Sequence, residues 1–541
     1  MSLFSTLIMG ARSLKAFQAA IQTTSHNISN ANTPGYSRQR AILSTVQPDQ
    51  TDAFLFGRGV QLEGIERLRL GFLDKQLRVE TAGLGATDAK MTTYQLMESI
   101  FQEPSDQGLS AALNKFWNAW QELSNDPPSL PLRANLRANA ANLSSAFNRL
   151  NTGLNGLKQS LNEDVKSEVT QINNLGANLA DLNKQIRTFI FRGENPVDLL
   201  DQRDLILDQL SQKLNISVID KGAGQMNVHV EGTLLVDENG FHSLKTAPRI
   251  GDTLGLVDVQ WKETNNLVDL RSGSLSGLIE SRDQIIPGYL NQLHEIASGM
   301  MSQINTIHGQ GMGIDGTRKI MGALPFTSTL LSNQSLGING INISLFSGDG
   351  LIDIVGRINA ATITTGVEAS IENNRLVLKP SITNPQTIQI TSDTGGVTKL
   401  LGIKGDFFSG TNASDMRVSD AVLSDLNFIA ASQTGAPGDN NNARAISHLK
   451  DALTLQGNTI GFNQYYRLMM TNLGSESQSV GFDQSNQKKI LEQMDNTRES
   501  VSGVSLDEEM TDLIKYQRSY EMAAKVIQTA DEMLAKLLEI A

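Results

Sequence analysis

The chain has 541 residues, a formal net charge of -12 and no cysteine. Its length predicts two to four domains whose cores are large enough to fold without cross-links. The lack of cysteine excludes disulfides, thiolate nucleophiles and cysteine-based metal sites. The acidic balance, without any basic run, argues against binding to nucleic acid or to an anionic membrane surface. No apolar run reaches the roughly 18 to 20 residues that span a bilayer.

The first ten residues, MSLFSTLIMG, are mostly apolar, and the basic residues Arg12 and Lys15 follow them rather than precede them. A cleaved secretory signal has the opposite polarity and a small-residue cleavage site. We therefore expect no cleaved signal peptide. This leaves open a cytoplasmic protein or one exported by a route that reads an uncleaved N-terminus.

A heptad pattern at the N-terminus predicts an amphipathic helix. The pattern advances in alternating steps of four and three from residue 3 to residue 28, with Gly10 and Thr24 as its weak positions. The helix is expected to end near Asn32, because Pro34 biases the residue before it away from helical geometry. The apolar side chains expected to meet another helix are Leu3, Leu7, Leu14, Phe17, Ile21 and Ile28.

The C-terminus carries a second helix of the same kind. Ser505 and Glu508 have the spacing of a capping box, and neither proline nor glycine occurs between residues 505 and 541. A helix of that length extends about 55 Å at roughly 1.5 Å per residue. Its predicted apolar stripe consists of Leu513, Tyr516, Tyr520, Ala523, Ile527, Ala530, Leu534 and Leu537.

Neither terminal helix can bury its stripe on itself, so each needs a partner. The N-terminal helix carries two bases and no acid, whereas the C-terminal one has eight acids and four bases. This difference favours pairing of the two helices through a weak, screened attraction. The alternative is that each packs separately on a globular core.

Between the termini, helical segments alternate with two strand-rich blocks. Helices are predicted over 73–102 with a break near Gly83 and Gly85, and over 109–123, 132–189, 196–214, 275–308 and from about 441 onward. Short strands are expected within 216–270 and within the Gly- and Thr-rich block 309–433, for example at 337–346, 375–378 and 387–390.

These elements predict a multidomain α+β fold, in which terminal coiled-coil helices adjoin an elongated α-helical bundle domain with inserted β-rich outer domains. Residues 1–50 and 500–541 are expected to form the helical inner domain. Residues 51–215, 271–310 and 437–499 would form the α-helical domain. Residues 216–270 would be a β-rich segment and 311–436 a β-rich outer domain.

Two patterns suggest chemistry at first sight. Gly311, Gly313 and Gly316 match GxGxxG spacing, but they follow a helix where a dinucleotide site needs a strand, so we expect a linker. Three acids at helical spacing are expected to form a solvated, salt-bridged face, namely Asp198, Asp201 and Asp204. With no catalytic triad motif either, we expect no enzyme activity, no cofactor and no metal.

Aromatic residues suggest packing rather than ligand binding. Trp117 and Trp120 lie three apart on a predicted helix, which is typical of core residues. Tyr36 follows Gly35 and is expected in an exposed loop, where it could serve an interface.

The residues from Ser25 to Gln39, SHNISNANTPGYSRQ, resemble the N-terminal signature of flagellar axial proteins. Residues 57–60, 65–67, 72–78, 199–204 and 502–509 are similar to the hook–filament junction (FlgK) family among them, although Arg69 and Leu70 stand where Tyr-Asp is expected. The signature positions carried over are Asn27, Asn30, Asn32, Thr33, Pro34, Gly35, Tyr36, Arg38, Ser505, Leu506, Asp507 and Glu508.

The resemblance implies a structural subunit of the bacterial flagellum at the junction of hook and filament. It implies export through the flagellar type III apparatus and an extracellular location. The implied partners are the hook protein, a second junction protein, further copies of the chain in a helical or ring assembly, and an export chaperone on the C-terminal helix, without nucleic acid or membrane insertion. Two alternatives stay open: another axial subunit of hook or flagellin type, or a β-rich insert that acts as a surface-binding module.

Overall fold

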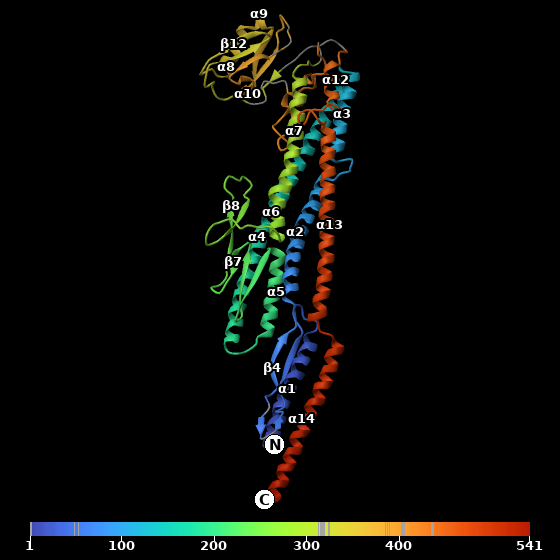
Figure 1. Cartoon of the computed structure of the whole chain (residues 1–541). Coiled ribbons are helices and arrows are strands. Elements are labelled where there is room, and N and C mark those ends of the chain that lie inside the picture. The colour runs from blue at the N-terminus through green and yellow to red at the C-terminus, as the bar shows by residue number, and fades with distance from the viewer. Residues whose placement is uncertain are drawn as a thin grey trace. The chain divides into compact units, whose positions relative to one another are not determined.

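A computed structural model describes residues 3–47, 49–51, 54–311, 313, 320–322, 325–384, 386, 388, 390–401, 406–433 and 438–540. By its internal contacts the chain divides into two compact units. The first unit comprises Met1–Thr92, Gln159–Ser281 and Ser479–Ala541, and the second comprises Thr93–Lys158 and Arg282–Gln478. The described residues form the mixed α+β fold that the sequence predicts (Figure 1). The four-region division given above stays a prediction.

The helices of the first unit come from both ends and the middle of the chain. They are α1 (Leu3–Asn30), the start of α2 (Gly71–Phe101), the second half of α4 (Leu130–Phe191), α5 (Val197–Lys213), α6 (Ser274–Glu280), the end of α13 (Phe462–Ser502) and α14 (Leu506–Ile540). A π-helical turn over Ser281–Ile285 follows α6. In Figure 1, α1 lies beside α14 with both chain termini at the same end of the pair, so the predicted pairing of the terminal helices is confirmed.

Four small sheets among the described residues belong to the first unit. Near α1, β1 (Gln39–Thr45) pairs antiparallel with β4 (Val60–Arg67), and β2 (Asp49–Thr51) pairs with β3 (Phe54–Phe56). The strands expected within 216–270 are present as a three-stranded sheet and a hairpin: β5 (Ile216–Gly222), β6 (Gln225–Val230) and β7 (Thr233–Val236), then β8 (Leu244–Pro248) and β9 (Val257–Trp261). Their inward side chains form one core with α4 and α5, which includes Val169, Leu207, Val228 and Trp261.

The helical part of the second unit has an aromatic core. Its elements are α3 (Leu109–Asn125), α7 (Ile286–His308), β16 (Phe408–Ser409), β17 (Arg417–Val418), α11 (Asp420–Ser424), a 3₁₀ turn (Leu426–Phe428) and α12 (Asn441–His448), with parts of α2, α4 and α13. Trp117 stacks on Phe462 at 6.2 Å, and Trp120 lies 5.2 Å from Phe407 between ring centroids. Both tryptophans are buried, as predicted.

A separate hydrophobic core organises the strand-rich block of the second unit. It contains β10 (Ile320–Met321), β11 (Gln334–Ile338), β12 (Ile341–Leu345), α8 (Leu351–Ala360), α9 (Thr362–Thr365), β13 (Val367–Glu372), β14 (Arg375–Pro380), β15 (Ile390–Thr394) and α10 (Val397–Leu401). The expected strand at 337–346 is a hairpin that turns at Asn339 and Gly340, both at positive φ. The residue pattern predicts only strands here, but the block also contains α8, whose Ile354 and Ile358 are buried in this core.

Several boundary predictions need correction. Residues 449–461 between α12 and α13 are not helical, although helix was expected from about 441 onward. The strand expected from Thr387 begins at Ile390, and Thr387 itself lies outside the described residues. Of the GxGxxG glycines, Gly311 packs tightly beside Asn442 and Gly316 lies outside the described residues.

Helix α2 is continuous through Gly83 and Gly85, so the predicted break was wrong. Packing explains Gly85, because a Cβ there would lie 2.1 Å from the carbonyl oxygen of Gln212 and 3.0 Å from the backbone nitrogen of Ser274. The glycine lets the ends of α5 and α6 approach α2 without a side chain between them. Close packing of backbone segments, and not a break in the helix, therefore explains why glycine occupies position 85.

We expect Gly85→Ala to lower the thermal unfolding temperature and to weaken amide protection of α5 and α6, since the new methyl group meets backbone atoms that cannot rotate away. Gly156→Ala in α4 is the matched control, because a Cβ there meets no atom within 4 Å. The control should be neutral or stabilising by about 0.5–1 kcal/mol, as glycine in a helix interior is unfavourable relative to alanine. Equal behaviour of the two variants would contradict the packing explanation.

Candidate assembly interface

The two terminal helices pack antiparallel along the stripes that the sequence predicts. Gly10 is buried against Ile527, where a Cβ on the glycine would lie 2.5 Å from Cγ1 of the isoleucine. Ala523 and Ala530 are also buried. The predicted stripe residues that are partly buried are Leu7, Leu14, Phe17, Ile21, Ile28, Leu513, Tyr516, Ile527 and Leu534. Tyr520 and Leu537 are exposed, and the side chain of Leu3 lies outside the described residues.

A buried polar cluster, which we call the clasp, ties the end of α1 to the first turn of α14. It consists of Asn27, Arg38 and Glu509. The Glu509 carboxylate is 2% exposed, and it accepts from Asn27 Nδ2 at 2.9 Å and from Arg38 Nε at 2.7 Å. Charge-assisted hydrogen bonds of this kind are the stronger ones in proteins. Burial would lower the pKa of Arg38, but Glu509 and Glu508 raise it above its ordinary value.

The chain around Asn27 is also fixed by hydrogen bonds. Asn27 Oδ1 accepts from the backbone nitrogen of Gln39 at 3.0 Å and from the Tyr36 hydroxyl at 2.7 Å. Tyr36 is therefore half-buried rather than exposed, which corrects the sequence prediction. Its pKa is raised, first by burial and then by Asp198. Asn30 donates to the carbonyl of His26 at 3.0 Å, so these signature residues shape the end of α1.

The start of α14 fits the expected cap only in part. Ser505 Oγ accepts from the backbone nitrogen of Glu508 at 3.5 Å. The Glu508 carboxylate does not return to the Ser505 backbone but accepts from Arg38 Nη1 at 2.8 Å. Leu506 and Asp507 are exposed. The N-terminal loop that follows α1 thus helps to fix the first turn of α14.

A buried ion-pair network lies beside the clasp in the first unit. Asp204 of α5 is 7% exposed and contacts Arg67, Arg69 and Arg78 at 2.9, 3.2 and 3.2 Å. Burial would raise the pKa of Asp204, but the three guanidinium groups lower it below its ordinary value. Asp201 is 6% exposed and pairs with Arg67 at 2.8 Å.

This network corrects one sequence inference and shows what holds Arg69 in place. The face with Asp201 and Asp204 was expected to be salt-bridged and solvated, yet it is salt-bridged and buried. Arg69, which departs from the family pattern, is held by Asp74 through bonds of 3.0 and 2.9 Å. The departure therefore adds a partner to Asp204 and does not disrupt the site.

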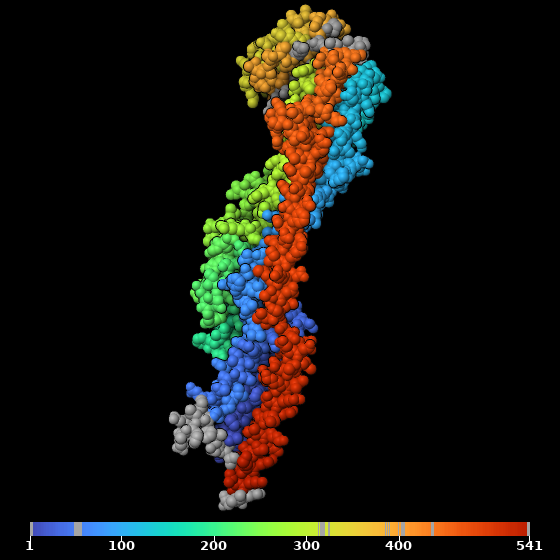
Figure 2. Space-filling model, turned by 45° about the vertical axis from the view of Figure 1, so that its right-hand side comes forward, coloured from blue at the N-terminus to red at the C-terminus, as the bar shows by residue number. Residues whose placement is uncertain are grey.

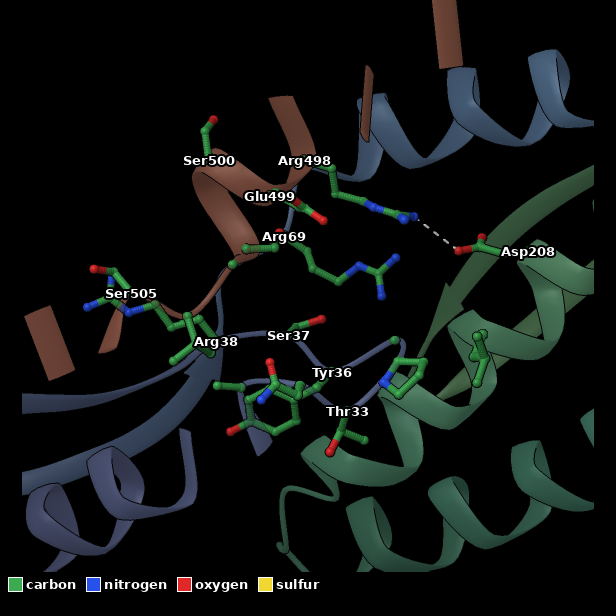
Figure 3. A pocket seen from close by; sticks show the side chains of 18 of the residues that line it. Thr33, Tyr36, Ser37, Arg38, Arg69, Asp208, Arg498, Glu499, Ser500 and Ser505 are labelled. Carbon is green, nitrogen blue, oxygen red and sulfur yellow. Dashed lines mark hydrogen bonds and ion pairs between the residues drawn. The ribbon is translucent and has the colours of Figure 1, made fainter. Parts of the chain in front are cut away.

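The two signature segments face each other across a hollow of about 770 Å³ (Figure 3). Figure 3 shows Thr33 and Tyr36 on one side, with Arg69 and Arg498 extending into the hollow from the other. Arg498 pairs with Asp208 at 3.2 Å, and Arg38 and Arg69 are engaged by the carboxylates described above. These three arginines already have carboxylate partners. The hollow is therefore a polar pocket beside the clasp, without an unpaired arginine among them to bind a ligand. Asn32, Thr33, Pro34 and Gly35 are exposed at its rim.

Further apolar side chains of α14 stay exposed, in a row of mostly four-residue steps that winds round the helix and that we call the open stripe. Its side chains are 39–68% exposed and comprise Leu506, Met510, Ile514, Met522, Val526, Met533 and Leu537. Phe4 and Ile8 of α1 are 66% and 51% exposed. In Figure 2, α14 (red) lies beside the blue N-terminal part of the chain. No other segment covers the face of α14 that is turned to the viewer. An apolar stripe of this length on a helix is typical of a surface that another protein covers.

Sequence reasoning missed the residues that matter most in this site. The predicted site residues do not include Glu509, Gln39 or Arg78. Glu509 lies four residues before Leu513 and so continues the heptad stripe, which was a readable signal for its burial. Nothing local marks Arg78, because its partners Asp204 and Asp208 lie more than 120 residues further along the chain.

Metal binding is not evident in the part of the chain that the structure describes. Among those residues no group of three His, Cys, Asp or Glu side chains is arranged to hold a metal ion. Within the same residues, no helix combines the length and the apolar character that crossing a membrane requires.

Four family models match the chain. They are described as flagellar hook-associated protein FlgK helical domain (residues 94–322), flagellar basal body rod FlgEFG protein C-terminal (498–540), flagellin hook IN motif (331–381) and flagella basal body rod protein (9–36). The clasp residues Asn27 and Glu509 fall within the two rod-protein models. The N- and C-terminal signatures thus match models of the wider axial family.

Curated relatives match over nearly the whole chain. Flagellar hook-associated protein 1 of Bacillus subtilis is 28% identical, over 99% of this chain and 98% of the relative. The protein of the same name from Escherichia coli is 26% identical, over 99% and 100%. The solved structure of the flagellar hook junction protein FlgK from Burkholderia pseudomallei has a TM-score of 0.52 at 17% identity, covering 79% of this chain and all of that one, and so shares its fold. Along nearly all of its length, the chain is a homologue of the flagellar hook-associated protein FlgK.

Proposed function

We propose that this chain is a structural subunit of the bacterial flagellum and that its copies assemble at the junction of hook and filament. The curated relatives are hook-associated proteins, a family of structural proteins and not of enzymes. The observation that carries the proposal is the exposed apolar stripe of α14 beside the α1 pair. Repeating heterologous contacts between copies build tubes and rings, and a long helix that keeps apolar side chains exposed beside a covered seam supplies such contacts.

The finer parts of the proposal follow from family membership. The chain would be exported unfolded through the flagellar type III apparatus and would act outside the cell. Its neighbours would be the hook protein, a second junction protein and further copies of itself. Before export, a chaperone would cover the C-terminal helix, whose open stripe is apolar enough to need protection in solution.

The proposal is tested by deleting the gene. Electron microscopy of the deletion strain should show hooks without filaments, and flagellin should accumulate in the medium. Reintroducing the unmodified gene should restore filaments. An antibody against the chain should label a short zone between hook and filament in normal cells. Label along the whole hook or filament would instead favour another axial subunit.

A second role for the strand-rich block is favoured by its own exposed side chains. Leu331, Ile352, Ile363 and Ile382 are 77–95% exposed on a block that has its own core. Such a block can serve as a surface-binding module in addition to the junction role. Deletion of residues 313–434 should then abolish adhesion of the bacteria to a surface while leaving motility intact. Loss of motility on the same deletion would assign the block to the tube.

A further inference from the structure

The apolar stripes of α1 and α14 do not by themselves fix how the two helices align. Both stripes repeat every seven residues with side chains of similar character. A slip of one helix by seven residues, about 10 Å at roughly 1.5 Å per residue, again places apolar side chains opposite one another. Coiled coils with such stripes need an added feature that selects one alignment.

Two contacts distinguish the observed alignment from slipped ones. One is the clasp between Asn27, Arg38 and Glu509. The other is the close approach of Gly10 to Ile527. The contacts are 17 residues apart on α1 (10 to 27) and 18 apart on α14 (509 to 527), as a single antiparallel alignment requires.

A slip in either direction breaks both contacts. Moving α14 seven residues one way sets the Glu509 carboxylate opposite Ala20, which has no side-chain donor. Moving it the other way sets Asn27 opposite Tyr516 and brings Ile527 against Phe17 in place of the glycine. A buried carboxylate without its donors is strongly disfavoured, so a slipped pair is penalised although its apolar contacts remain.

We propose that the Asn27–Arg38–Glu509 clasp, with Gly10 as a notch for Ile527, sets the alignment in which the two ends of this chain pair. The clasp is a positioning device, and the apolar stripes supply most of the attraction. A buried polar group that fixes register is the best-attested use of such groups in helix pairs. The alignment in turn decides where the open stripe of α14 stands relative to Phe4 and Ile8 of α1. Only one part of this inference rests on the proposed function, namely that the open stripe serves in assembly. The alignment of the two helices is measured in the isolated chain and does not depend on it.

The test uses spin labels on the purified full chain, which has no cysteine of its own. Gln22→Cys and Gln528→Cys place labels on exposed positions of α1 and α14, and the distance between labels is measured by double electron–electron resonance. With the clasp intact we expect one narrow distance. With Asn27→Leu and Glu509→Met added, we expect a second population displaced by several Å, since each slip moves the helices by about 10 Å along their axes.

The matched control is Glu508→Met, which removes a neighbouring carboxylate that also bonds Arg38 but whose side chain is 62% exposed. It should keep the single distance. A single unchanged distance in the Asn27→Leu, Glu509→Met variant would overturn the proposal, because the stripes alone would then suffice. A broad distribution without discrete populations would also overturn it, since the clasp would then supply pairing itself. Gly10→Leu with the clasp intact should also produce a displaced label-to-label distance. If that distance is unchanged, Gly10 has no part in setting the alignment. None of these results depends on where the subunit sits in the flagellum.

Discussion

Bacteria that carry Ile527→Asp are expected to be non-motile, because the substitution places a carboxylate in the seam between α1 and α14. Ile527 is partly buried, and its side chain packs directly over Gly10. An unpaired charge in such a contact costs several kcal/mol, on the order of 3. The two terminal helices should therefore separate, while the aromatic core of the second unit stays folded. Leu14→Asp on the facing helix should have the same effect.

Swimming in soft agar measures the cellular effect, and hydrogen exchange of the purified chain measures its cause. In the Ile527→Asp protein, α1 and α14 should lose amide protection while α3 and α7 keep theirs. Gln528→Asp is the control, because it adds the same charge at the next, exposed position of α14. A motile Ile527→Asp strain, or a purified variant with an intact helix pair, would count against the assigned role of this seam.

Met522→Asp separates pairing from assembly. Met522 belongs to the open stripe of α14 and is 68% exposed, so a carboxylate there should leave the α1–α14 pair protected. If copies of the chain meet along this stripe, the variant should nevertheless reduce motility. Normal motility would restrict the assembly surface to other residues of the pair.

The largest expected loss of stability comes from Asp204→Ala. The substitution removes a buried carboxylate that three arginines share, and it leaves Arg67, Arg69 and Arg78 with fewer partners. Breaking a buried ion pair in this way costs about 3–5 kcal/mol. Lys166→Ala is the control, because its pair with Glu163 is exposed and such pairs contribute about 0–1 kcal/mol. Amide exchange across α5 compares the two variants without assuming that the whole chain unfolds in one step.

The pH dependence of the same variant follows from the lowered pKa of Asp204. A carboxylate whose pKa is lower in the folded than in the unfolded chain stabilises the fold fully above the unfolded value, about 3.9. That stabilisation is lost as the pH falls through the folded value. The difference in protection between the wild type and Asp204→Ala should therefore be constant near neutrality and shrink in acid. Asp208 acts in the opposite sense, because burial raises its pKa and favours its protonated form in the folded chain.

The terminal helices could be predicted because their signal is local. Heptad spacing and the proline after α1 both lie within short stretches of sequence, and the pairing follows from stripes that have no other cover. The burial of Asp201 and Asp204 could not be read in the same way. Helical spacing shows that they share a face, but the arginines that cover it arrive from β4 and α2, more than 120 residues earlier.

Two errors have different causes. The break in α2 was predicted because glycine has a low helix propensity. Gly85 instead allows the distant backbone at Gln212 and Ser274 to approach the helix closely, and helix propensity carries no information about such tertiary contacts. Helix α8 was readable but overlooked, since Leu351, Ile354 and Ile358 have helical spacing. The surrounding threonines, together with the β-branched residues of the helix itself, favoured strands and hid that period.

The clasp joins residues 482 positions apart in the chain. Closing so long a loop is entropically expensive and slow compared with forming the local helices on either side. The pair of terminal helices is therefore the last part of a newly made subunit to be completed, and it requires the final helix to be present. A chain cut short before residue 505 would keep a folded second unit, but its α1 would lack α14 as a partner. Truncated copies are therefore unable to offer the surface that the paired helices α1 and α14 form in complete copies.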